Sequence, residues 1–132
     1  MIALNLSDIR GWLAGRLPVG DTWFGAGKME ARRERALCLF ARRRGILARH
    51  AVSGEAGYAV MPLSLAIRGG DEHDEAEGFA NSLYAALDSA RFELLGASCF
   101  VKKIHAAPLA LGTDRRGIYE FSVDFDLYYS TM

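Results

Sequence analysis

The chain has little cysteine and no excess of charge of either sign. Its 132 residues include two cysteines, Cys38 and Cys99, and 16 basic residues balance 16 acidic ones. No CxxC or cysteine–histidine spacing occurs, so the sequence predicts no zinc site. Both thiols lie inside apolar runs, which is typical of a protein made in a reducing cytoplasm. A net charge of zero excludes a whole-molecule field that attracts nucleic acid or membranes.

Long hydrophobic runs and catalytic motifs are missing as well. No apolar run approaches the length of a membrane span, and no signal peptide precedes the first expected helix, so we expect no membrane contact. The stretch GAGK lacks the rest of a phosphate-binding loop, because Met29 follows Lys28 where a hydroxyl residue is needed. His105 has no serine or cysteine placed to use it as a base. We therefore predict no enzymatic activity, no cofactor and no metal.

Residues 117–129, GIYEFSVDFDLYY, alternate more regularly than any other segment. Successive side chains of a β-strand point to opposite faces, so this stretch predicts a long strand with one apolar and one acidic face. The apolar face needs a covering layer, and the acidic face needs either water or a basic partner. The apolar positions are Tyr119, Phe121, Val123, Phe125, Leu127 and Tyr129, and the polar ones are Glu120, Ser122, Asp124 and Asp126.

The remaining elements follow from the hydrophobic periodicity. Helices are expected at residues 6–17, with Ser7 as N-cap, and at residues 71–88. Further strands are expected at residues 36–41, 58–68 and 97–107, with Pro62 at a sheet edge or at the start of its strand. Residues 21–35 receive no assignment, and residues 108–116 read as a loop. This order predicts a single α+β domain over residues 1–132, a two-layer sandwich with a mostly antiparallel sheet of about four strands and two helices packed on one face.

Arginines flank the apolar run at residues 36–41 on both sides. Such a pattern is typical either of two solvated sheet edges or of two charged rims that meet partners, since arginine pairs with carboxylates in bidentate geometry. The arginines are Arg32, Arg33 and Arg35 before the run, and Arg42, Arg43 and Arg44 after it.

The C-terminal part of the chain resembles the tail terminator proteins of long-tailed bacteriophages, in the branch often labelled minor capsid protein. The resemblance covers roughly the last two-thirds of the chain. It rests on a strand ending in IRGG, an acidic helix containing AEGFANSLYAALD, a further strand, and a loop that leads into a long last strand. The matching loop residues are Pro108, Leu109, Gly112, Asp114 and Gly117, and the matching strand residues are Glu120, Phe121, Ser122, Val123, Asp124 and Phe125.

The resemblance implies a structural role in the virion. Such proteins are similar in forming a six-fold ring that caps the head-proximal end of the tail tube, stops tube polymerisation and joins the tail to the head. The implied partners are further copies of the chain, the tail tube protein and a head connector or completion protein, with passive contact to DNA that passes through the ring. The implied location is the neck of a virion assembled in the bacterial cytoplasm, with the gene carried by a phage or a prophage.

A ring needs a head-to-tail interface between copies. The hypothesis is that the arginines around residues 36–41 face Glu120, Asp124 and Asp126 across subunits, so that reversing Asp124 and Asp126 to lysine weakens assembly. Two alternatives remain open. One is another head–tail connector protein, such as a head-completion protein. The other is a small nucleic-acid-binding module, against which the zero net charge and the lack of an aromatic–basic platform count.

Overall fold

The computed structural model describes residues 4–30, 32–42, 47–50, 57–87 and 91–130. These ranges contain two helices and eight strands. The elements are α1 (Leu6–Arg16), β1 (Trp23–Ala26), β2 (Arg35–Ala41), β3 (Leu47–His50), β4 (Gly57–Gly69), α2 (His73–Ala86), β5 (Phe92–Leu94), β6 (Ala97–Lys103), β7 (Leu109–Thr113) and β8 (Tyr119–Ser130).

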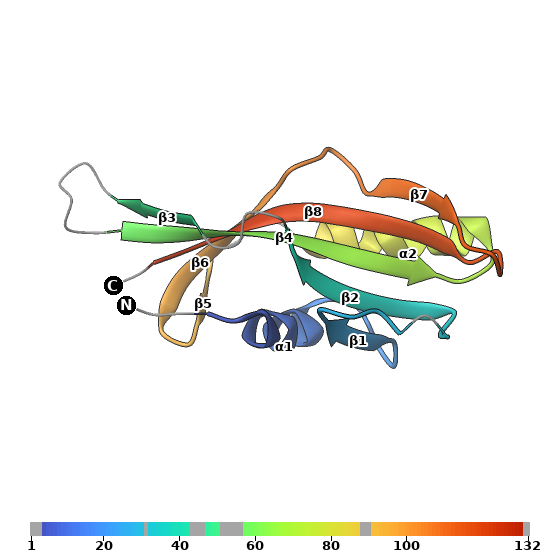
Figure 1. Ribbon diagram of the computed structural model, residues 1–132, viewed down its shortest axis with the longest axis horizontal. Helices are drawn as coiled ribbons and strands as arrows, with labels where there is room; N and C mark the ends of the chain where they lie inside the picture. The colour runs from blue at the N-terminus through green and yellow to red at the C-terminus, as the bar shows by residue number, and fades with distance from the viewer. Residues whose placement is uncertain (1–3, 31, 43–46, 51–56, 88–90, 131–132) are drawn as a thin grey trace.

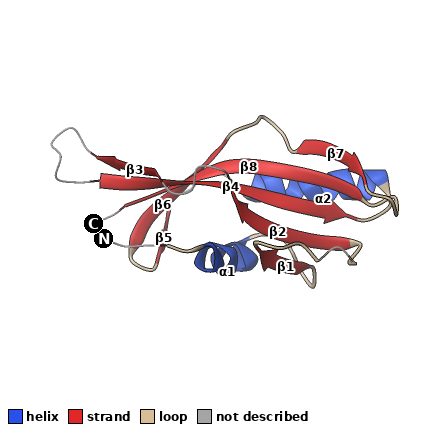
Figure 2. Cartoon of the chain, in the orientation of Figure 1, coloured by secondary structure: helices blue, strands red, loops and turns tan. Residues whose placement is uncertain are grey.

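The strands form one sheet around the long β4–β8 pair. The strand order is β1-β2-β4-β8-β6-β5, with β3 also paired to β4 and β7 also paired to β8. Every pairing is antiparallel except that of β1 with β2. The sheet curls into a half-barrel, with β4 and β8 side by side along most of the long axis (Figure 1, Figure 2). Their register runs from Tyr58 opposite Ser130 to Arg68 opposite Glu120.

The predicted two-layer sandwich of about four strands, with two helices packed on one face, is wrong. Its expected strands correspond to β2, β4, β6 and β8, whereas the sheet contains eight strands and is curled. The four missed strands, β1, β3, β5 and β7, are only three to five residues long. Such short strands carry too little alternation to stand out, and pairing with long neighbours defines them. Accordingly β1 lies in the unassigned residues 21–35, and β7 lies in the expected loop 108–116.

The core lies against the apolar rows of the long strands. Phe125 and Leu127 of β8 and Leu63 and Leu65 of β4 are at most 1% exposed. The same cluster contains Ile9 and Leu13 of α1 and Ala76, Ala80 and Leu83 of α2. Cys38 and Cys99 are buried free thiols, and burial raises the pKa of each. The expected apolar face of the last strand is therefore confirmed, as is the burial of both cysteines.

Two local predictions need correction. The N-cap of α1 is Asn5 rather than Ser7, because the Asn5 side chain accepts a hydrogen bond from the Asp8 backbone amide while the Asp8 side chain accepts one from Asn5. Pro62 lies within the central strand β4 rather than at an edge. It falls between Val60, which pairs with β3, and Leu63, which pairs with β2. Because neither β3 nor β2 pairs with Pro62 on that side of β4, its missing amide hydrogen leaves no bond of the strand pairing unmade.

Candidate interaction surface

The outer face of the β4–β8 pair carries a row of polar side chains. β8 alternates buried residues with half-buried ones, and the half-buried positions include Glu120, Ser122, Asp124 and Asp126. The register places Arg68 opposite Glu120, Ser64 opposite Asp124 and Pro62 opposite Asp126. The alternation of one strand thus brings the predicted acids onto a single face, and the neighbouring strands supply their partners.

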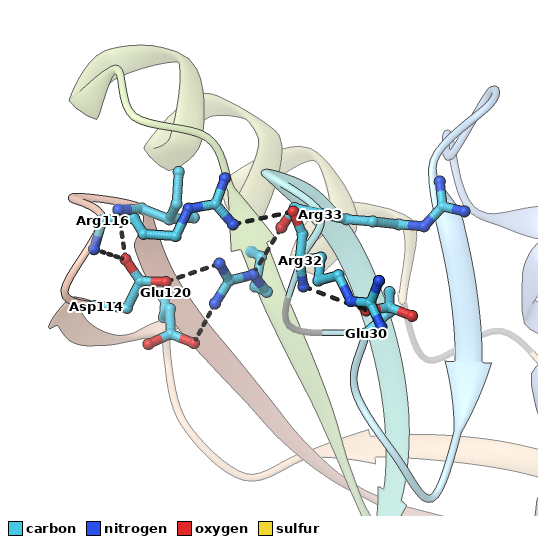
Figure 3. Close-up of polar contacts among 8 residues, drawn as sticks. Glu30, Arg32, Arg33, Asp114, Arg116 and Glu120 are labelled. Atoms are coloured by element: carbon cyan, nitrogen blue, oxygen red, sulfur yellow. Dashed lines mark hydrogen bonds and ion pairs between the residues drawn. The ribbon is translucent and has the colours of Figure 1, made fainter.

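Arg68 is the centre of the first polar cluster, at one end of this row. Its side chain is 4% exposed, and its Nη2 and Nη1 atoms lie 2.7 Å from Asp114 Oδ2 and 3.2 Å from Glu120 Oε2. Its Nε donates a hydrogen bond to the Arg33 carbonyl at 2.9 Å, and Arg116 donates one to the Arg32 carbonyl at 3.0 Å (Figure 3). These bonds attach the segment before β2 to the turn between β7 and β8.

Asp114 organises that turn. Its Oδ1 atom accepts hydrogen bonds from the backbone amides of Arg116 and Ile118 at 2.8 and 3.0 Å. The bond from Ile118, followed by the one from Arg68, lowers the pKa of Asp114 to about 2. Gly112 and Gly117 on either side have φ values of 91° and 81°, which glycine adopts without strain. Three residues of the resemblance motif thus have local structural roles.

Asp124 is the centre of a second cluster. Ser64 Oγ and Ser122 Oγ donate hydrogen bonds to Asp124 Oδ1 at 2.9 and 3.1 Å, and His105 Nε2 lies 3.5 Å from Asp124 Oδ2. In a serine hydrolase the imidazole lies between the serine and the carboxylate, whereas here the carboxylate lies between the other two. Among the described residues, neither serine contacts the imidazole, so the arrangement differs from that of a serine hydrolase.

Each acid that the sequence singled out has a partner within its own chain. Arg42 forms an ion pair with Asp126, Arg68 pairs with Glu120, and the serines and His105 surround Asp124. The structure thus joins Arg42 to Asp126 without a second subunit. Pairing of these groups across subunits stays a prediction.

The other predicted arginines are placed differently. Arg32 lies 3.9 Å from Glu30, and the guanidinium of Arg35 lies 4.5 Å from the centre of the Phe79 ring of α2. The Arg33 side chain extends away from the Arg68 cluster (Figure 3). Arg43 and Arg44 lie outside the described residues. Arg33 and Arg35 line an open hollow of about 510 Å³, together with Pro18, Val19, Trp23 and Phe79.

Sequence reasoning missed an aromatic row at the other end of the β4–β8 pair. Tyr58, Tyr128 and Phe100 lie on the adjacent strands β4, β8 and β6, and Arg91 lies beside β5. The ring centres of Phe100 and Tyr128 are 4.6 Å apart, and those of Tyr58 and Tyr128 are 5.8 Å apart. The Arg91 guanidinium lies 5.4 Å from the Phe100 ring centre. These residues also line a cavity of about 440 Å³. The alternation within each strand determines the sheet face on which its ring lies. The rings become neighbours only because β4, β8 and β6 are adjacent in the sheet.

The rings of the aromatic row contact one another. Tyr128 stacks on one face of Phe100 and lies between Phe100 and Tyr58, so the rings mainly cover one another. Binding of single-stranded nucleic acid uses open faces on which successive bases stack. The row contains two tyrosines, and an arginine lies beside it. Tyrosine and arginine are enriched in protein interfaces.

No protein-family model matches the chain, and no curated protein matches it significantly. Within the part of the chain that the structure describes, no group of three or more His, Cys, Asp or Glu side chains could hold a metal ion. Among the same residues, no helix is long and apolar enough to cross a membrane.

Proposed function

We propose that this protein is a structural component of a bacteriophage tail, a terminator that forms a ring on the head-proximal end of the tail tube. The observation that carries the proposal is the sequence pattern from β4 to β8, with its strand, acidic helix, Pro-Leu-Gly-Asp loop and long last strand. In the structure Asp114, Gly112 and Gly117 of this pattern shape the turn before β8. The resemblance therefore rests on residues that specify a fold.

The surface of the chain supports a role in assembly. The aromatic row with its cavity and the hollow beside Arg33 and Arg35 are two different surfaces, on different strands. A head-to-tail ring needs two different, complementary surfaces on each copy, whereas a two-fold dimer uses one surface twice. In the polar clusters of the outer face, the described serines bond to Asp124 rather than to His105.

The test of this proposal is an assembly experiment with the tail tube protein encoded in the same genome. Purified chain is added to polymerising tube protein, and tube lengths and tube ends are examined by negative-stain electron microscopy. We expect shorter tubes, each with an extra ring at one end. Tubes of unchanged length with unchanged ends would contradict the proposal. Binding only to a head connector, with no effect on tubes, would instead identify another neck component.

A further inference from the structure

The turn between β5 and β6 carries an apolar side chain where the backbone disfavours one. Leu95 has a φ of 50° and is 65% exposed, and Gly96 after it has a φ of 84°. Two-residue hairpin turns with positive φ at both positions prefer Asn-Gly, because a residue with a Cβ atom is strained there. Leucine thus adds strain and leaves an apolar side chain in water. Strain of this kind persists at sites of function.

Two of the predicted interface arginines, Arg33 and Arg35, have no acidic partner among the residues that the structure describes. Among the described residues, Arg33 and Arg35 take part in no side-chain ion pair, and Glu120 and Asp126 already pair with Arg68 and Arg42. Glu93 is exposed, lies two residues before Leu95, and has no ion pair among the described residues either. The β5–β6 hairpin therefore combines the exposed apolar side chain of Leu95 with the exposed carboxylate of Glu93.

The hollow beside Arg33 and Arg35 has the complementary composition. Pro18, Val19, Trp23 and Phe79 supply apolar surface. The charged lining residues are Arg33, Arg35 and Asp21, so the two arginines outnumber the one acid and leave a net positive charge. This hollow adjoins β1, whereas the Leu95 turn follows β5, and these are the two ends of the strand order. In Figure 1, β5 and β1 appear on either side of α1. A contact that joins different patches on two copies is head-to-tail, and it closes into a ring when the rotation permits.

We infer that Leu95 of one copy inserts into the hollow beside Arg33 and Arg35 of the next copy, with Glu93 facing the arginines. This inference rests on the proposed function, since it names the contact that closes the ring. Interface hot spots lie in well-packed pockets and are enriched in tryptophan and arginine, and both residue types line this hollow. The acidic first turn of α2 is a poorer partner, because α2 itself supplies Phe79 to the hollow.

The first arm of the test is Leu95→Asn, which creates the preferred Asn-Gly turn and removes the apolar side chain. We expect the melting temperature to rise by about 3–6 °C, because left-handed strain is relieved. We expect self-association, measured by analytical ultracentrifugation and on tube ends by microscopy, to weaken by about tenfold or more. The matched control is Leu111→Asn, since Leu111 is 60% exposed but lies on β7, and this variant should assemble normally.

The second arm exchanges charges and does not depend on the turn. Glu93→Arg alone and Arg33→Glu alone should each weaken assembly, and the double variant should recover much of it, because the two charges are exchanged across the interface. Normal rings from Leu95→Asn, or no recovery in the double variant, would overturn the Leu95 contact while leaving the proposed function intact. A wild-type chain that forms no ring even on tube ends would overturn the proposed function and this contact together.

Discussion

Arg68 forms ion pairs and a hydrogen bond with three residues that are distant from it in the sequence. Because its guanidinium is almost fully buried, its charge must be matched, and Asp114 of the β7–β8 turn and Glu120 of β8 match it. Its third bond, to the Arg33 carbonyl, attaches a segment that has little regular structure of its own. A glutamate that reads in the sequence as part of an acidic outer face is in fact part of an in-chain network.

Asp114 should make stability depend on pH in the acid range. Its folded pKa is lowered to about 2, below the value of about 3.9 for an unfolded aspartate. The folded state therefore holds the proton less tightly, so the stabilisation is fully present above about pH 4 and is lost as pH falls toward 2. Urea unfolding of the wild type and of Asp114→Asn between pH 5 and pH 2 measures this.

The Asp114→Asn variant should be less stable near neutral pH, and its urea midpoint should change less across the acid range than that of the wild type. Parallel loss of stability in both proteins would show that Asp114 is not the group responsible. Arg115→Ala serves as the control, since Arg115 is exposed in the same turn and substitutions of exposed residues usually change stability by less than about 0.5 kcal/mol.

At the scale of elements, the packing of α2 on β4 depends on Gly69. A Cβ atom at Gly69 would lie 2.7 Å from both the Cα and the Cβ atoms of Ala76, and these belong to a buried turn of the helix. Gly69→Ala should therefore destabilise the fold by about 1–3 kcal/mol, as overpacking does. Chemical denaturation compared with the wild type gives the value.

The matched control for this prediction is Gly78→Ala. Gly78 lies inside α2, and a Cβ atom there would meet nothing within 4 Å. Replacing a helical glycine by alanine in open space should stabilise the protein by about 0.5–1 kcal/mol. Equal effects from the two substitutions would mean that α2 does not approach β4 as closely as the structure indicates.

At the scale of the whole molecule, one core connects both helices with the long strands. Trp12 of α1 stacks on Phe92 of β5 with ring centres 3.6 Å apart, and Trp23 lies in β1 at the other end of the strand order. Trp12 packs against the core, and Trp23 lies in a strand that pairs with the core strand β2, so unfolding should be a single transition. Urea curves followed by tryptophan fluorescence and by far-UV circular dichroism should coincide. Two separated transitions would indicate that the chain contains two units.

The candidate site was only partly predictable. Alternation placed Glu120, Asp124 and Asp126 on one face of one strand, because that pattern is local. Their partners Arg68, Ser64 and Arg42 come from elsewhere in the chain and are set by the strand register. The same limit applies to the aromatic row, whose rings come from three strands. Pairing over long sequence separations leaves no local periodicity to read.

The sequence by itself determined the long strands, both helices and the buried row of β8, because burial of one face imposes a period that a single segment displays. The turn before β8 depends on nearby residues too, since glycine is needed at positive φ and Asp114 bonds to nearby amides, but the sequence predicted a loop over residues 108–116 and missed β7. Only the tertiary structure decided the four short strands, the curl of the sheet and the choice of ion-pair partners. These depend on which strands are neighbours, and that follows from the joint packing of the whole core.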